Sequence, residues 1–383
     1  MFIPKRIIFE KDSLKYDIAK EIFDKFKDKD NIEIINMTSN KLKQHIPGDN
    51  LFAQYREGKK TLVVGIKKSL KFQSCKPSAN FQLPLVSGCM GQCEYCYLNT
   101  MLGDKPFVKI HVNTDDILNQ AQKYIDERLP EITIFEGAAT SDPIPVESYT
   151  HSLERAITFF GNNENSRFRF VTKYNDINSL LNLKHNGHTE IRFSINTSFV
   201  INQYEHVTAS RDQRIEASIK AAKAGYPIGF LIAPVFIYPD WEEEYHDLLL
   251  ELKNKLPNDL KFPVTFEIIS HRYTTIAKNR ILDIFPENKL PMNDEERKFK
   301  YGQFGYGKYV YPKENLDEIK QFFRKEIEEL FTNKEVKYII WVFMRRIKLG
   351  KMIIISINVL KIYFAHKEYS QSNRCFIAGK YIS

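Results

Sequence analysis

The segment Ser87-Gly-Cys-Met-Gly-Gln-Cys-Glu-Tyr-Cys-Tyr97 places Cys89, Cys93 and Cys96 in a C-x3-C-x2-C pattern. Three thiolates on a short glycine-containing loop can hold three irons of a [4Fe–4S] cluster, which leaves the fourth iron without a protein ligand. An open position of this kind separates a catalytic metal site from a closed one. The main alternative is a zinc site, which usually shows a second cysteine or histidine pair, and the sequence has none. We therefore predict an iron–sulfur cluster that is open to a small molecule.

Outward from this loop, strand and helix candidates alternate as far as about residue 290. Strand candidates rich in Val, Ile and Phe lie at 81–86, 131–135, 168–172, 190–196, 227–235 and 263–269. Amphipathic helical stretches lie near 114–127, 148–160, 175–183, 211–224, 240–255 and 274–284. Such β-α units favour parallel strands with right-handed crossovers. The predicted fold class is α/β, with a partial (β/α)6 TIM-type barrel, open on one side, whose chemistry lies at the C-terminal strand ends.

Three further parts flank the barrel. The predicted parts are 1–80, a smaller N-terminal α/β domain; 81–290, the barrel; 291–340, a C-terminal extension; and 341–383, a basic tail. In the extension, glycines between aromatic residues over 300–311 predict a β-hairpin, and an amphipathic helix follows over 316–331. The tail is aperiodic and resembles a disordered arm more than a packed element, so we expect no function from it.

Charge and cysteine content limit the class of protein. The net charge is +8, but residues 341–383 hold eight Lys/Arg and one Glu, while the rest holds 48 basic and 47 acidic side chains. Global charge is therefore weak support for nucleic-acid binding. The odd count of five cysteines, three of them clustered, argues against a disulfide framework and favours a reducing cytoplasm. No signal peptide and no apolar run of about 20 residues is evident, so no membrane association is expected.

Six segments carry a more specific pattern. They read Cys89-Met-Gly-Gln-Cys-Glu-Tyr-Cys-Tyr-Leu-Asn-Thr100, Phe135-Glu-Gly-Ala-Ala-Thr-Ser-Asp142, Arg169-Phe-Val-Thr-Lys-Tyr174, His185-Asn-Gly187, Arg192-Phe-Ser-Ile-Asn196 and Gly307-Lys-Tyr-Val-Tyr311. The cysteine pattern alone resembles the radical S-adenosylmethionine (SAM) superfamily. The combination, in order from about residue 60 to about 338, resembles the spore photoproduct lyase family within it.

This resemblance implies a DNA repair lyase. In the family, a [4Fe–4S] cluster cleaves SAM to a 5′-deoxyadenosyl radical, which takes a hydrogen atom from C6 of spore photoproduct, 5-thyminyl-5,6-dihydrothymine. The lesion then reverts to two thymines and SAM is regenerated. The implied partners are double-stranded DNA carrying the lesion and an electron donor such as a flavodoxin or ferredoxin. The implied location is the interior of the spore or germinating cell.

Four residues are candidates for SAM contact by match to the family motifs: Ser141, Asp142, Lys173 and Ser194. Their chemistry suits the task, because a lysine can pair with the SAM carboxylate and the other three can exchange hydrogen bonds with its polar groups. All four lie at or near the ends of predicted strands. The alternative for each is an ordinary polar residue at a strand end.

The hydrogen donor departs from the family pattern. Many members have a cysteine where this chain has Ala139, and alanine cannot quench the thymine radical. Either the chain is inactive or another residue donates, and we hypothesise that Cys75 does so. The alternative for Cys75 is a small buried hydrophobe. Tyr95 and Tyr97 flank Cys96, and family members use tyrosines here to relay hydrogen; the alternative is aromatic packing around the cluster.

DNA contact is expected at the Gly-aromatic hairpin. A lesion inside a duplex must leave the base stack to be reached, and a wedge then fills the gap. Gln303, Phe304 and Tyr306 near the hairpin tip are the wedge candidates, and Lys308 is a phosphate contact. Further basic candidates are Arg297, Lys298 and Lys300, and a second set comprising His271, Arg272, Lys278 and Arg280. The alternative is a solvated charged surface.

Two other functions remain open at this point. One is a radical SAM enzyme that acts on another nucleic-acid base. The other is a DNA-binding protein with a closed structural or redox cluster, in which Cys75 would be the fourth ligand.

Overall fold

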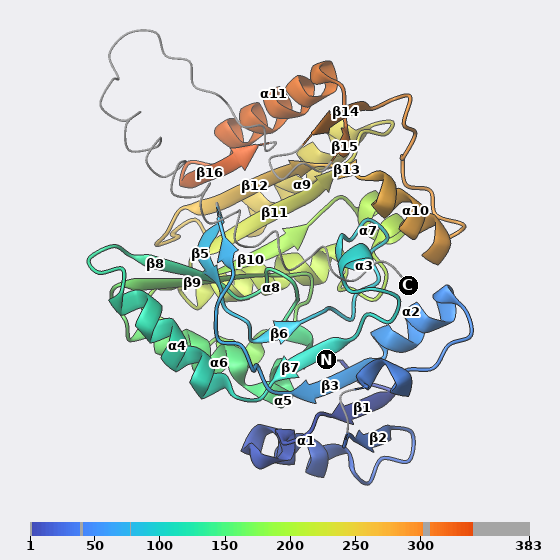
Figure 1. Ribbon diagram of the computed structural model, residues 1–383. Coiled ribbons are helices and arrows are strands. Elements are labelled where there is room, and N and C mark those ends of the chain that lie inside the picture. The colour runs from blue at the N-terminus through green and yellow to red at the C-terminus, as the bar shows by residue number, and fades with distance from the viewer. Residues whose placement is uncertain (1, 39–40, 77, 302–306, 340–383) are drawn as a thin grey trace, which may run out of the picture. The chain divides into compact units, whose positions relative to one another are not determined.

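The computed structural model describes residues 2–38, 41–76, 78–301 and 307–339 (Figure 1). Residues 1–340 form one compact unit. The predicted tail at 341–383 and the hairpin-tip residues Gln303, Phe304 and Tyr306 lie outside the described residues. Within the described part, no helix has the length and apolar character needed to cross a membrane.

The central sheet has the strand order β16-β12-β11-β10-β9-β8-β5-β4 and curls into a half-barrel (Figure 1). Six strands match the predicted series: β5 (Ala79–Gln82), β8 (Thr133–Glu136), β9 (Ser166–Thr172), β10 (Thr189–Ile195), β11 (Ile228–Val235) and β12 (Val264–Ser270). They pair in parallel, which confirms the partial TIM-type barrel. Two edge strands were not predicted: β4 (Ser74–Cys75), antiparallel to β5, and β16 (Lys334–Ile339), parallel to β12.

The helices between these strands follow the predicted order with one exception. The main ones are α4 (Thr114–Asp126), α6 (Ser152–Gly161), α8 (Arg211–Lys223), α9 (Trp241–Lys255) and α10 (Thr275–Ile284). The predicted helix at 175–183 is wrong: β9 and β10 are joined through a short 3-10 turn, Asn178–Leu180. Asn, Asp and Ser dominate that stretch, and their short polar side chains compete with helical backbone hydrogen bonds.

A second sheet has the order β2-β1-β3-β7-β6. Its strands are β1 (Arg6–Phe9), β2 (Glu33–Asn36), β3 (Thr61–Gly65), β6 (Val86–Ser87) and β7 (Val108–His111), with helices α1 (Asp17–Phe26) and α2 (Leu51–Lys59). The strand predicted at 81–86 is thus divided, because Pro84 cannot donate to a ladder, and β6 pairs with β7 instead. Strands on both sides of the boundary predicted near residue 80 therefore share one sheet. The cysteine loop begins where the chain leaves this sheet.

The C-terminal extension contains the predicted hairpin and helix. A three-stranded antiparallel sheet comprises β13 (Arg272–Tyr273), β15 (Gly307–Val310) and β14 (Lys298–Tyr301), and α11 (Lys313–Leu330) follows. Short helices complete the fold: α3 (Leu98–Met101), α5 (Glu147–Thr150) and α7 (Ser198–Tyr204).

Phe160 tests the packing between α6 and the sheet. Its ring is fully buried, stacks on Phe168 at 5.1 Å and contacts Phe135 at 5.2 Å between ring centroids. We expect Phe160→Ala to lower the free energy of unfolding by about 3–5 kcal/mol, because it removes a large buried ring and leaves a cavity. Urea unfolding measures the loss. The neighbouring half-buried Phe159→Ala is the control, and an equal loss in both variants would contradict this packing.

Candidate active site

The cysteine loop has room for a bound group beside its thiols. Cys93 is buried, and Cys89 and Cys96 are half-buried. The Gly91 N–H donates to Cys89 Sγ at 3.3 Å. A Cβ at Gly91 would lie 3.0 Å from the Tyr174 hydroxyl and 3.3 Å from that sulfur, so glycine keeps this space free. A larger residue at position 91 would therefore crowd the Cys89 sulfur.

The electrostatics of the thiols fit an iron cluster. Burial raises the pKa of Cys89 to about 11 and that of Cys93 further, and the neighbouring thiols contribute to the rise in both. Thiolates in this position need a cationic partner, which irons supply. Among the described residues, no three potential ligand side chains gather around a point as a single metal ion requires. A cluster that gives each thiolate its own iron does not need that arrangement.

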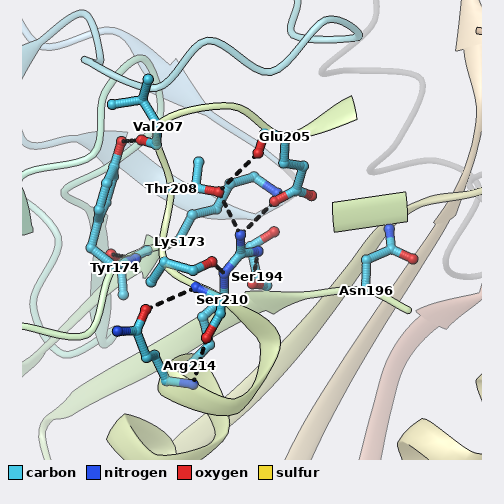
Figure 2. Close-up of polar contacts among 12 residues, drawn as sticks. Lys173, Tyr174, Ser194, Asn196, Glu205, Val207, Thr208, Ser210 and Arg214 are labelled. Atoms are coloured by element: carbon cyan, nitrogen blue, oxygen red, sulfur yellow. Dashed lines mark hydrogen bonds and ion pairs between the residues drawn. The ribbon is translucent and has the colours of Figure 1, made fainter. Parts of the chain in front are cut away.

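A buried carboxylate, Glu205, organises the neighbouring wall of the site (Figure 2). Its Oε1 accepts from Lys173 Nζ at 2.8 Å and from the Tyr95 hydroxyl, and Lys173 also donates to that hydroxyl at 2.9 Å. Its Oε2 accepts from Arg214 at 2.6 Å. Arg214 is itself fully buried and donates further to the Ser194 carbonyl and the Thr208 hydroxyl. One carboxylate thereby links the cysteine loop, β9 and α8.

The charges of this group leave a net positive site. Burial of Glu205 would by itself raise its pKa, but Lys173 and Arg214 outweigh that effect and hold the pKa at about 2. Two cations and one carboxylate sum to one positive charge. The Lys173 side chain is 20% exposed, so this charge is accessible to an anionic group such as a carboxylate.

The other SAM candidates occupy different roles in the site. Both Asp142 oxygens are engaged, by the Thr172 hydroxyl, the Lys173 N–H at 2.8 Å and the Ile144 N–H at 3.3 Å. Burial raises the pKa of Asp142 to about 6. The Ser141 hydroxyl is buried and has no hydrogen-bond partner among the described residues, as expected for a group that awaits a ligand. Ser194 is buried in β10 near Arg214.

Cys75, Tyr97 and Ala139 come together at the edge of the half-barrel. The Tyr97 hydroxyl donates to the Ala139 carbonyl, and the Tyr97 side chain is about half exposed. Cys75 is half-buried and close enough to Tyr97 to influence its pKa, which burial and the Cys96 thiol raise. Burial and Glu136 raise the pKa of Cys75 to about 11. Cys75 and Ala139 are thus linked through Tyr97, which contacts Ala139 and is influenced by Cys75, whereas Tyr95 belongs to the separate Lys173–Glu205 group.

Sequence reasoning missed a buried charge network on the β-sheet. Arg169 and Arg192 pair with Glu136 and Glu267, with Arg192 Nη1 3.1 Å from Glu267 Oε2. Arg169 also donates to the Ser78 carbonyl at 3.2 Å, which ties the β4–β5 hairpin that carries Cys75 to the sheet. The sequence did contain a signal for this network, because Arg and Glu residues interrupt strand candidates that are otherwise rich in Val, Ile and Phe. Glu205 and Arg214 gave none, because they lie in separate helical and loop segments.

The DNA candidates divide into two groups. Arg272, Lys298, Lys300 and Lys308 lie on one face of the β13–β15–β14 sheet by cross-strand register. The others are engaged within the fold: His271 and Arg297 are buried, Lys278 pairs with Asp294 at 2.9 Å, and Arg280 pairs with Asp104 at 2.9 Å. Tyr301, which the sequence analysis did not single out, is 78% exposed beside the hairpin tip.

Comparison with known proteins decides the family. The family model described as spore photoproduct lyase matches residues 2–340. The chain belongs to this family. It is 54% identical to the spore photoproduct lyase of Clostridium acetobutylicum over 336 residues, 88% of this chain and 98% of the relative. Membership confirms the predicted radical SAM lyase with a [4Fe–4S] cluster and SAM as cofactors.

Two solved structures of the family are similar in fold. A spore photoproduct lyase complexed with dinucleoside spore photoproduct has a TM-score of 0.84 at 46% identity, covering 88% of this chain and 99% of that one. A mutant with one cysteine replaced by alanine and one serine by cysteine, with bound AdoMet and the same dinucleoside, has a TM-score of 0.83 at 46% identity and the same coverage.

The Glu205 group gives a prediction for pH dependence. A carboxylate with a pKa of about 2 in the folded state stabilises the fold above its unfolded pKa of about 4.3, and this is lost as pH falls toward 2. Glu205→Gln leaves Lys173 and Arg214 without a counter-charge. We therefore expect the free energy of unfolding to fall by about 3–5 kcal/mol relative to the wild type at pH 7, and this difference to become smaller in acid. Urea unfolding at pH 7 and pH 3 measures both. Glu216→Gln, with a side chain 68% exposed, is the control; a loss independent of pH would contradict the assignment.

Proposed function

We propose that this chain repairs DNA by reverting spore photoproduct, 5-thyminyl-5,6-dihydrothymine, to two thymines. Its membership of the family over residues 2–340 carries this proposal. When bound, the cluster and SAM would supply the carbon-radical chemistry that removes a hydrogen atom from C6 of the lesion and finally gives one back. We place the enzyme in the interior of the spore or germinating cell, with a flavodoxin or ferredoxin as electron donor.

Ser141, Asp142, Lys173 and Ser194 would form the SAM site. Lys173 would pair with the SAM carboxylate, because the Glu205 group retains one positive charge and Lys173 is its exposed member. The unpartnered Ser141 hydroxyl would contact a polar group of SAM. Asp142 acts through its hydrogen bond to the Lys173 backbone, and Ser194 lines the same wall.

Cys75 would donate the hydrogen atom that ends the repair. Its S–H bond gives hydrogen to the thymine-centred radical, which leaves a sulfur radical. Donation needs the protonated thiol, and a pKa of about 11 keeps Cys75 protonated at neutral pH. The mutant of the solved relative also has one cysteine replaced by alanine and one serine replaced by cysteine. The proposed replacement of a cysteine at Ala139 by Cys75 is of the same kind.

Tyr97 would return a hydrogen atom to the Cys75 sulfur and would itself recover one from 5′-deoxyadenosine, so that SAM can be regenerated. Its hydroxyl donates to the Ala139 carbonyl, and a phenol, with an ordinary pKa of about 10, is protonated at neutral pH. Tyr95 is a positioning residue in this proposal, since its hydroxyl is shared between Glu205 and Lys173. Relay through Tyr95 would first require that group to rearrange.

Double-stranded DNA would bind on the cationic face of the β13–β15–β14 sheet. Burial and the Arg272 charge both lower the pKa of Lys308, so the two cations are unfavourably close until an anion neutralises them. A phosphate between Arg272 and Lys308 would do so. Gln303, Phe304 and Tyr306, which follow β14 in the sequence, remain the proposed wedge.

Anaerobic reconstitution with iron, sulfide and SAM, followed by incubation with spore-photoproduct dinucleotide, tests the function. We expect stoichiometric conversion to thymine and a change in the cluster's EPR spectrum when SAM is added. A spectrum unresponsive to SAM would instead favour the closed cluster. A SAM response without turnover would favour another nucleic-acid base as substrate.

The Cys75 role predicts the product distribution of variants. We expect Cys75→Ala to consume the lesion but to give adducts of the thymine radical in place of clean thymine, because the radical has no nearby S–H bond. Ala139→Cys in the Cys75→Ala background should restore thymine. Chromatography of the products after single turnover measures both. Clean thymine from Cys75→Ala would refute the donor role.

The cationic face predicts the salt dependence of DNA binding. We expect Lys308→Ala and Arg272→Ala each to reduce the slope of log K against log salt by about 0.9, the value for one phosphate contact. Fluorescence anisotropy with duplex DNA at several salt concentrations measures the slope. Lys220→Ala on α8, away from this sheet, is the control. An unchanged slope in both sheet variants would exclude this face.

A further inference from the structure

Lys59, the last residue of α2, reaches the cysteine loop from the second sheet. Its ammonium donates to the Cys89 carbonyl at 2.9 Å and to the Gly91 carbonyl at 2.7 Å. The residue is 2% exposed. A lysine buried to this extent is unusual unless its charge is paired. The cation therefore lies on the backbone of the loop that carries the three thiols.

The sequence around Lys59 explains how it comes so close. A Cβ at Gly58 would lie 2.5 Å from the Pro106 carbonyl oxygen, so only glycine lets α2 approach the segment that follows the loop. Tyr55, one helical turn earlier, has its ring 5.4 Å from Lys59 Nζ and its hydroxyl on Asn99. Asn99 in turn donates to the Cys93 carbonyl at 3.0 Å. One face of α2 thus holds the loop at two points.

The charge of Lys59 has no carboxylate partner in the part of the chain that the structure describes. Its partners are two neutral carbonyls and the face of the Tyr55 ring, and it forms none of the ion pairs found there. A buried charge is costly unless an opposite charge compensates it. A [4Fe–4S] cluster with three thiolates is net negative, and one-electron reduction adds to that charge. Lys59 is placed to compensate it.

We propose that Lys59 is a positioning residue that acts as the built-in counter-charge of the cluster and raises its reduction potential. The proposal rests on the cluster assigned to this family. Cluster potentials depend on net charge, hydrogen bonding and solvent exposure, and a buried cation beside the loop favours the reduced, more negative state. The cluster would then accept an electron from a weaker donor than it otherwise could.

Potentiometric EPR titration of the reconstituted protein tests this. At the potential where the wild-type cluster is half reduced, we expect Lys59→Met to lower the ratio of reduced to oxidised cluster at least tenfold, about 59 mV for one electron. Lys59→Gln keeps an N–H donor without the charge, and it should lower the ratio of reduced to oxidised cluster by the same factor. Lys59→Arg should stay near the wild type. Lys60→Met, the adjacent half-buried lysine, is the matched control and should not shift.

The outcomes separate this inference from the proposed function. If the wild type assembles a SAM-responsive cluster but Lys59→Gln or Lys59→Met, folded by circular dichroism, keeps its potential, the counter-charge role is refuted. An Arg variant that shifts as far as Met also refutes it. If the Lys59→Met and Lys59→Gln variants do not fold, Lys59→Arg decides. A cluster potential near that of the wild type in Lys59→Arg supports the counter-charge role, and a large shift refutes it. A wild type that binds no cluster overturns the proposed function itself.

Discussion

The carboxylate of Glu205 is the contact on which the site depends. It receives Lys173 from the end of β9, Arg214 from α8 and Tyr95 from the cysteine loop, and the side chains of Glu205 and Arg214 are fully buried. A buried carboxylate is tolerated only when such partners surround it. Loss of the Glu205 carboxylate would leave the Lys173 and Arg214 cations without a counter-charge. Three segments far apart in sequence must therefore arrive together, which fixes the loop relative to the strand ends.

The proposed chemistry divides along the same geometry. Tyr95 and Lys173 lie on the Glu205 side, where charge is concentrated, whereas Cys75 and Tyr97 lie at the sheet edge beside Ala139. The pKa values of Cys75 and Tyr97 are both raised, so both groups are protonated at neutral pH. Hydrogen-atom donors need that state, whereas thiolates that ligate iron need the opposite one.

Local patterns in the sequence predicted the half-barrel and its hairpin well, because strands such as β9 and β10 alternate apolar residues along one buried face and are bounded by turns. They overestimated the helix at 175–183, where Asn and Ser prefer turns, and ran β5 into β6 across Pro84. The cluster cysteines were found from their spacing, and Lys173 through resemblance to the family motifs. Glu205, Arg214 and Lys59 could not be found this way, because each acquires its role only from partners distant along the chain.

The pairing of β6 with β7 and of β7 with β3 has a consequence for how this protein could have evolved. The half-barrel cannot be separated from the N-terminal sheet by cutting near residue 80, since the segment that leads into the cysteine loop would become an unpaired sheet edge. The N-terminal sheet and the strand that leads into the cysteine loop therefore depend on each other. A lineage that lost the N-terminal sheet would lose the scaffold of its metal centre with it.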